Sequence, residues 1–193
     1  MCMTSQRSSP EALNLGMDIH ESLSHAELLK LLDVYAKNWL AHDGSWFLAL
    51  EEAYGHKAAV EMDVRAWERF AEAEARRIMR AFDIPPGGGL PALAQALRFR
   101  LYARINPQTI EWIDDHTLIF RMVECRVHQA RERKGLPLFG CQPVGMMEFA
   151  TFARTIDPRI RTRCLSCPPD PMTTPGCGWE FTLEEGETLH DRS

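Results

Sequence analysis

Residues 109–127 read TIEWIDDHTLIFRMVECRV, and this stretch decides the fold class of the chain. Polar and apolar residues alternate over 109–113, the DDH sequence at 114–116 is typical of a turn, and 118–127 is rich in strand-forming residues. These features predict a β-hairpin whose second strand runs to residue 127. Because side chains alternate across a strand, Cys125 is expected on its apolar face.

The residues before the hairpin indicate helices. Ser24 and Glu27 have the spacing of a capping box, and apolar residues follow at helical intervals. We expect the DGS sequence at 43–45 to interrupt this helix, with a short helix after it. Longer helices are predicted over 56–82 and 90–104, separated by a Pro- and Gly-rich turn. The expected apolar stripe of the first of these comprises Ala59, Met62, Ala66, Phe70 and Ala73.

The residues after the hairpin return to mixed structure. A loop is expected around 135–140, a helix over 143–156, and strands over 159–163 and 179–183. The prediction is an α+β fold, with N-terminal helices packed on a C-terminal antiparallel sheet and one inserted helix.

We divide the chain into a flexible arm over 1–22, one domain over 23–185 and a tail over 186–193. Within the domain, the helical part covers 23–105, and the sheet and cysteine part covers 106–185.

Composition restricts the function classes. The net charge of −5, from 22 basic and 27 acidic side chains, argues against a nucleic-acid partner, which usually requires a basic surface. No signal peptide or membrane-spanning run is visible, so we expect a cytoplasmic protein with no membrane partner. The tryptophans and methionines of the helices are explained by a plain core, although they could also line a ligand pocket.

Five of the six cysteines fall within 125–177, and they carry the candidate chemistry. Two of them form a CxxC motif, which lets two thiolates share one tetrahedral ion, and a third follows after a Pro-rich loop. In a reducing compartment such groups bind metal more often than they form disulfides. We predict bound zinc, and inert buried thiols or a catalytic thiol remain the alternatives. The candidate metal ligands are Cys125, Cys141, Cys164, Cys167 and Cys177.

Cys141 has a second candidate role. It lies just before the helix that starts near Pro143, where free backbone N–H groups favour a thiolate. This thiol could therefore be a metal ligand or a nucleophile, and the former is favoured. His128 and His116 are the histidines that the fold could bring near it. Glu148 and Asp170 are weak candidate bases, and a surface location is the favoured explanation for each.

The second half contains several distinctive motifs: CRV (125–127), RKGL (133–136), CQPVG (141–145), FARTIDPRI (152–160), CLSCPPD (164–170) and CGWEF (177–181). Together with WFLALE at 46–51, these motifs resemble an uncharacterised family of bacterial cytosolic proteins. More remotely, the cysteine pattern resembles the vinyl-reductase-type domain, whose superfamily includes haem-based nitric-oxide sensors and vesicle-tethering subunits. The order of elements is also similar to that of the L-2-amino-thiazoline-4-carboxylate hydrolase family.

The resemblance implies a helical layer on an antiparallel sheet, frequent homodimers and cysteine-bound zinc in some members. The matching positions are Cys141, Cys167 and Cys177, whereas Cys164 is not required by the remote pattern. No histidine lies at a convincing axial position for haem. The functional prediction is a zinc-binding module for a small organic ligand. The alternative is a hydrolase that opens a small ring or amide by zinc or cysteine chemistry.

Overall fold

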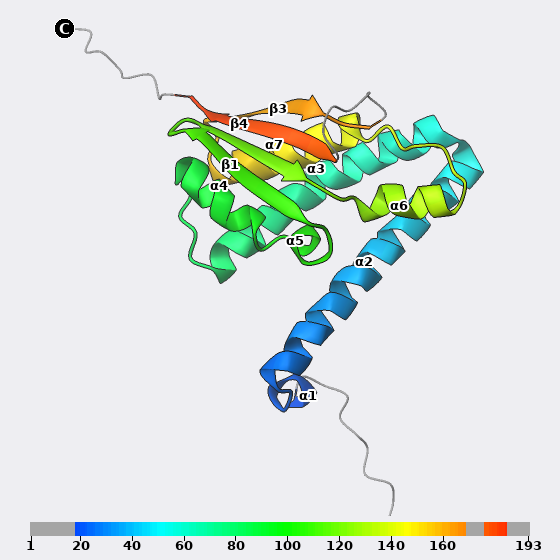
Figure 1. Cartoon of the computed structure of the whole chain (residues 1–193), viewed down its shortest axis with the longest axis horizontal. Coiled ribbons are helices and arrows are strands. Elements are labelled where there is room, and N and C mark those ends of the chain that lie inside the picture. The colour runs from blue at the N-terminus through cyan, green and yellow to red at the C-terminus, as the bar shows by residue number, and fades with distance from the viewer. Residues whose placement is uncertain (1–17, 169–175, 185–193) are drawn as a thin grey trace, which may run out of the picture.

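The structure is a computed structural model, and it describes residues 18–168 and 176–184. The α+β prediction is confirmed: helices dominate the N-terminal half, and a four-stranded antiparallel sheet forms the C-terminal half (Figure 1). The elements are α1 (Asp18–Glu21), α2 (His25–Tyr54), α3 (His56–Ala81), α4 (Gly89–Leu97), α5 (Leu101–Ile105), β1 (Gln108–Asp114), β2 (Thr117–Met122), α6 (Arg126–Arg133), α7 (Gln142–Ile156), β3 (Ile160–Ser166) and β4 (Cys177–Leu183).

The sheet has the strand order β1-β2-β4-β3, and every neighbouring pair is antiparallel. Alternation along β2 places Leu118, Phe120 and Met122 in the interior, where they meet Trp179 and Phe181 of β4. Helices α3 and α7 pack on each other and cover one face of the sheet (Figure 1). The core therefore lies between this helix pair and the inner face of the strands.

The predicted break at residues 43–45 is wrong, because α2 runs unbroken through 30 residues. The Ser45 hydroxyl donates a hydrogen bond to the carbonyl of Ala41 at 2.8 Å, so this polar side chain is accommodated within the helix. A helical glycine costs only about 1 kcal/mol relative to alanine, and packing on α3 offsets it. Trp39 of α2 stacks on Phe70 of α3 with ring centroids 5.4 Å apart.

The predicted strand over 118–127 is also too long. Met122 is the last residue of β2 because the first residues of both neighbouring strands, Gln108 and Cys177, pair with it. Beyond that point the backbone has no strand partner and turns into α6. The amide N–H of Arg126 donates to the side chain of Asn106 at 3.3 Å at the start of this helix. Cys125 therefore lies at the N-terminus of α6 and not on a face of the sheet.

Two helix predictions need smaller corrections. The predicted helix over 90–104 is divided into α4 and α5, because Arg100 turns into the core between them, where its side chain is 2% exposed. The stripe predicted on α3 is rotated: Met62 and Ala66 are exposed, and Trp67, Ala71, Ala75 and Ile78 are buried instead. The arginine and glutamate pairs on the solvated face of α3 do not determine which of its apolar residues pack against the rest of the chain.

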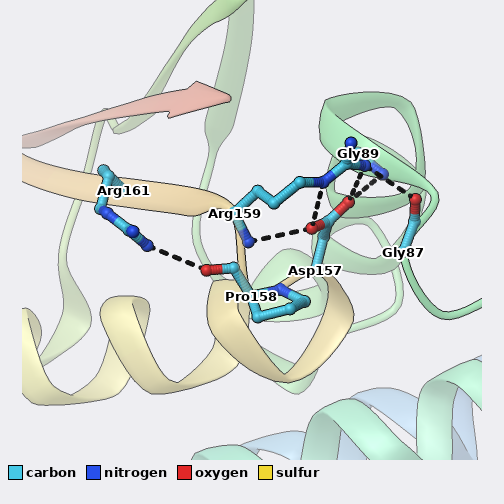
Figure 2. Close-up of polar contacts among 6 residues, drawn as sticks. All are labelled: Gly87, Gly89, Asp157, Pro158, Arg159 and Arg161. Atoms are coloured by element: carbon cyan, nitrogen blue, oxygen red, sulfur yellow. Dashed lines mark hydrogen bonds and ion pairs between the residues drawn. The ribbon is translucent and has the colours of Figure 1, made fainter. Parts of the chain in front are cut away.

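Asp157 joins the end of α7 to the start of α4 (Figure 2). Its carboxylate is fully buried and accepts hydrogen bonds from the backbone N–H of Gly89 at 3.0 Å and of Arg159 at 3.0 Å. The guanidinium of Arg159 also contacts it, at 2.7 Å, and reaches the carbonyl of Gly87 at 3.2 Å. These contacts fix the position of α7, which carries part of the candidate site at its other end.

The predicted arm and tail fall mostly outside the described residues, apart from α1, and the domain division stays a prediction. No described helix combines the length and apolar character that a membrane span requires.

Candidate functional site

Four of the five predicted cysteine ligands converge at the N-terminus of α7. Cys141 is the N-cap residue of that helix, and its Sγ lies 3.1 Å from the Sγ of Cys167, which follows β3. Cys177, the first residue of β4, also contacts Cys167. Cys125 and His128, from the first turns of α6, lie beside these thiols. We call these five residues the cysteine cluster.

The contacts within the cysteine cluster shift the pKa values of its thiols in opposite directions. The Cys167 thiol, hydrogen-bonded to Cys141, lowers the pKa of Cys141, and nearby His128 lowers it further. The same contact raises the pKa of Cys167, because a second negative charge would lie against the first. Burial raises the pKa of Cys125 to about 11. The arrangement therefore favours the thiolate at Cys141 over Cys125 and Cys167.

The cluster can be compared with the requirements of zinc. No group of three or more His, Cys, Asp or Glu side chains across 18–168 and 176–184 has the geometry of a formed metal site. Tetrahedral zinc with bonds of about 2.3 Å holds its sulfur ligands about 3.8 Å apart. The sulfurs of Cys141 and Cys167 would separate by less than about 1 Å to reach this distance. The donor types therefore fit zinc, whereas the described residues do not form a site that could hold the ion in this arrangement.

A cavity of about 580 Å³ opens beside the cysteine cluster. Its volume lies within the range of small-molecule sites in proteins, about 300–1,000 Å³. Apolar and aromatic side chains form most of its walls, and Cys125, Cys141 and Cys177 lie along it. The aromatic residues around it are Phe47, Trp67, Tyr102, Phe139, Phe149 and Trp179.

Trp179 can line this cavity only because residue 145 is a glycine. A Cβ added to Gly145 would lie 2.5 Å from the Trp179 ring, so no larger residue fits between α7 and this indole. Gly145, within the predicted helix over 143–156, therefore leaves the space that the Trp179 ring occupies. Gly44 of α2 also lines the cavity, and a Cβ there would meet nothing within 4 Å.

Three carboxyl groups from three helices line the same cavity: Asp43 of α2, Asp63 of α3 and Glu148 of α7. Burial raises the pKa of Asp63 to about 7, and the negative charges of Asp43 and Glu148 add to the effect. Burial also raises the pKa of Glu148 to about 7, although Arg100 opposes that shift. The interior of the cavity therefore disfavours uncompensated negative charge.

Arg100 is the buried cation behind this wall. It contacts Glu74 at 2.9 Å and Glu148 at 2.7 Å, and all three side chains are at most 10% exposed. Its guanidinium also lies over the rings of Phe149, at 5.3 Å, and Phe152, at 4.7 Å. Glu148, a weak candidate base, is thus part of a buried ion-pair group.

Two buried donors in residues that line the cavity have no hydrogen-bond partner within 18–168 and 176–184. They are the side-chain amide of Asn106 and the indole N–H of Trp179, in residues that are 4% and 1% exposed. Buried donors in native proteins are normally paired, and an unpaired one costs about 1–3 kcal/mol. Both nitrogens are buried from the cavity as well, so a ligand there would not contact them without a rearrangement of the wall.

The remaining predicted residues have different locations. Cys164 lies on β3 opposite Trp179, three residues before Cys167. His116 is exposed in the β1–β2 turn, and Asp170 lies outside the described residues. The carboxyls of Asp43 and Asp63 were not among the site residues predicted from the sequence. The only signal for Asp63 was its position one turn before Trp67 on the same face of a helix.

Comparison with known proteins gives one family. The sequence profile described as "Family of unknown function (DUF6125)" matches residues 21–183. The chain belongs to DUF6125. No curated protein matches this DUF6125 chain significantly.

Two solved structures are similar to this chain at low sequence identity. One is the phenol-responsive sensory domain of the transcription activator PoxR with phenol, with a TM-score of 0.50 and 15% identity, covering 74% of this chain and 73% of that one. Another is a trafficking protein particle complex subunit 3 from Naegleria fowleri covalently bound to palmitic acid. Its TM-score is 0.46 at 8% identity, covering 83% and 98% of the two chains. The similarity to the sensory domain concerns the fold alone. Neither of these two structures is described as a vinyl reductase or as an L-2-amino-thiazoline-4-carboxylate hydrolase.

Proposed function

We propose that this DUF6125 chain binds a small, mostly apolar organic molecule that carries a hydrogen-bonding group. The observation that carries the proposal is the cavity of about 580 Å³, whose walls are mostly apolar and aromatic and include the carboxyl-bearing residues Asp43 and Asp63. Such a combination of apolar walls and few polar groups is typical of ligand sites. The sensory domain of PoxR, which has a similar fold, was solved with phenol, and this supports the same class of ligand.

A cavity-filling variant tests the proposal. Gly44→Leu places a side chain in open space within the cavity and improves helix propensity, so α2 should remain intact. Ala53→Leu, on the exposed surface of the same helix, is the matched control. Titration calorimetry with a panel of phenols and benzyl compounds should show binding to the wild type and to Ala53→Leu, and none to Gly44→Leu. Wild type that binds no panel member below 1 mM, or unchanged binding by Gly44→Leu, would refute the proposal.

We further propose that the cysteine cluster holds one zinc ion. Cys141, Cys167 and Cys177 would be three ligands, and Cys125, Cys164 or His128 the fourth. Their thiol groups lie close together at the junction of α7, β3 and β4, which supports this set. Four protein ligands would make the zinc a structural cross-link. Glu148 is paired with Arg100 and is therefore not a free base for the hydrolase alternative.

Metal analysis of the chain purified without chelator tests the zinc proposal. We expect about one zinc per chain, and Cys141→Ser should lower zinc content and melting temperature together, since metal-binding energy is folding energy. Absence of metal from the wild type would refute the proposal. Unchanged zinc content in Cys141→Ser would show that Cys141 is not a ligand, and the proposal for the other residues would stand.

We also propose a homodimer formed through the N-terminal half of α2. Figure 1 shows that the N-terminal end of α2 lies far from the sheet, and this half contacts α3 and α5, among other places where Arg104 meets Asp33 and the Leu29 carbonyl. Leu32 and Tyr35 are each 53% exposed there, and contiguous exposed apolar surface is rare on monomers. Light scattering should give twice the 22.0 kDa chain mass, and Leu32→Glu should give the monomer mass. A wild-type monomer at micromolar concentration would refute the proposal.

A further inference from the structure

The thiols of Cys141 and Cys167 are close enough to react with each other. Their sulfurs lie 3.1 Å apart, and both residues are free thiols. A disulfide bond is about 2.05 Å long, so the two sulfurs would need to approach by only about 1 Å. Cys141 precedes the first residue of α7 and Cys167 follows the last residue of β3, so neither lies inside a helix or a strand. A movement of this size therefore leaves both elements in place.

The sequence motif alone would suggest a different pair. Cys164 and Cys167 form the CxxC motif, whose two thiols are common redox partners. The structure instead places Cys164 opposite Trp179 in the sheet and the sulfur of Cys167 against Cys141, 26 positions away in the chain. The contact across the fold, and not the local motif, defines the pair of sulfurs that are ready to bond.

The two thiols differ in their access to small molecules. Cys141 is half-buried and lies along the cavity of about 580 Å³, so a small molecule that enters the cavity meets this residue. Cys167 is 0% exposed, and its thiol contacts Cys141 and Cys177. An oxidant therefore reacts first at Cys141, and Cys167 reacts with a sulfur that already lies beside it. This is the arrangement of an accessible thiol next to a resolving thiol.

We infer that Cys141 and Cys167 form a reversible disulfide when a hydroperoxide enters the cavity. The sulfur of Cys141 attacks one peroxide oxygen, an S–O bond forms, the O–O bond breaks, and the other oxygen leaves with the thiol proton as water or an alcohol. The sulfur of Cys167 then attacks the sulfenic acid at its sulfur, an S–S bond forms, and water leaves with the Cys167 proton. Two thiols lose two electrons in total, and one peroxide gains them.

This bond would join the start of α7 to the end of β3 beside the cavity, where Gly145 and Glu148 of the same helix also form the wall. The inference needs neither the ligand proposal nor the zinc proposal, because it concerns the two sulfurs alone. A zinc ion held by Cys141 and Cys167 would be released as they bond, since the thiolate is the metal ligand and a disulfide sulfur is not a thiolate.

Disulfide mapping of the full wild-type chain tests the inference. The chain is treated with a small molar excess of hydrogen peroxide near neutral pH, alkylated, and digested without reductant for mass spectrometry. Chymotrypsin cuts after Leu165 and Asp-N cuts before Asp170, so the two enzymes together separate Cys164, Cys167 and Cys177. We expect linked peptides that contain Cys141 and Cys167, and a fall from six to four in the thiols titrated after unfolding. Dithiothreitol should restore all six.

Four cysteine variants sharpen the test. Cys167→Ser should prevent the disulfide and leave Cys141 as a sulfenic acid that dimedone labels, and Cys141→Ser should lose both the disulfide and the label. Cys164→Ser, which removes the CxxC motif, should still form the bond. Cys2→Ser, outside the cysteine cluster, is the matched control and should behave as the wild type.

The wild-type map decides the inference even where a variant fails to fold. A disulfide that joins Cys167 to Cys164 or to Cys177, or six thiols that survive the peroxide, would overturn it. Loss of the bond in a folded Cys164→Ser would also overturn it. Zinc content measured before oxidation separates the two proposals for these thiols, because a metal-free wild type that forms the Cys141–Cys167 disulfide refutes the zinc ion and supports the reactive pair.

Discussion

Replacement of Asp157 by alanine should destabilise the fold more than replacement of its ion-pair partner. The fully buried carboxylate accepts hydrogen bonds from the backbone N–H groups of Gly89 and Arg159, and both would lose their acceptor (Figure 2). Each unpaired donor costs about 1–3 kcal/mol. The ion pair adds little, about 1 kcal/mol or less, because the Arg159 side chain is 45% exposed. The two donors together give about 2–6 kcal/mol, and we expect a value near the lower end, about 3 kcal/mol, because Arg159 is an exposed residue whose N–H water can reach.

Urea denaturation and thermal melts measure this loss. For a chain of this length about 3 kcal/mol corresponds to a fall in Tm of roughly 6–12 °C. Arg159→Ala keeps its backbone N–H and should cost about 1 kcal/mol or less. Equal destabilisation by the two variants would refute the assignment of the energy to the backbone contacts.

The effect of Asp157 should depend on pH in a defined direction. The side chain of Arg159 holds the pKa of Asp157 below its ordinary value of 3.8. A lowered pKa means that the stabilisation is present above that ordinary value and is lost as the pH falls through the folded-state pKa. The difference between wild type and Asp157→Ala should therefore be constant near neutral pH and shrink in strong acid.

Three further predictions concern the cavity and its supports. Gly176→Ala should prevent stable folding, as judged by circular dichroism, because the new Cβ would lie 1.6 Å from the Met122 carbonyl oxygen at positive φ. Gly145→Ala should cost about 1–3 kcal/mol in urea denaturation and change the fluorescence of Trp179, because its Cβ overlaps that ring. Asp63→Asn should raise stability at pH 8 by about 2 kcal/mol and leave it unchanged at pH 4, since a carboxyl pKa raised to about 7 loses stability as the pH rises through it. A destabilised Asp63→Asn at pH 8 would contradict that assignment.

The sequence was informative where local chemistry and packing agree. The strand over 179–183 and the helix over 143–156 have strong periodicity and clear boundaries, and both are present. The strand prediction failed beyond Met122 because strand length depends on where the neighbouring strands begin, which no local pattern contains. The break predicted in α2 failed because its packing against α3 offsets an unfavourable glycine.

The site was also predictable only in part, because the packing of distant elements decides which residues meet in it. A CxxC motif and a nearby third cysteine indicate a cluster, and Cys141, Cys167 and Cys177 do meet. The carboxyls of the cavity could not be found this way. Asp43 and Asp63 belong to stretches with ordinary surface composition, and only the angle between α2 and α3 places both beside one cavity.

The unbroken α2 has a mechanical consequence. Gly44 and Phe47 lie against the cavity, and Leu28 lies near the projecting end of the same rod. Sixteen residues of helix separate Leu28 from Gly44, a length of about 24 Å at 1.5 Å per residue. A tilt of about 5° about Gly44 would therefore move Leu28 by about 2 Å, as the end of a lever moves farther than its pivot. A change in cavity size that tilted α2 would therefore disturb the contacts of Arg104 with Asp33 and with the Leu29 carbonyl, which hold this end of the helix to α5.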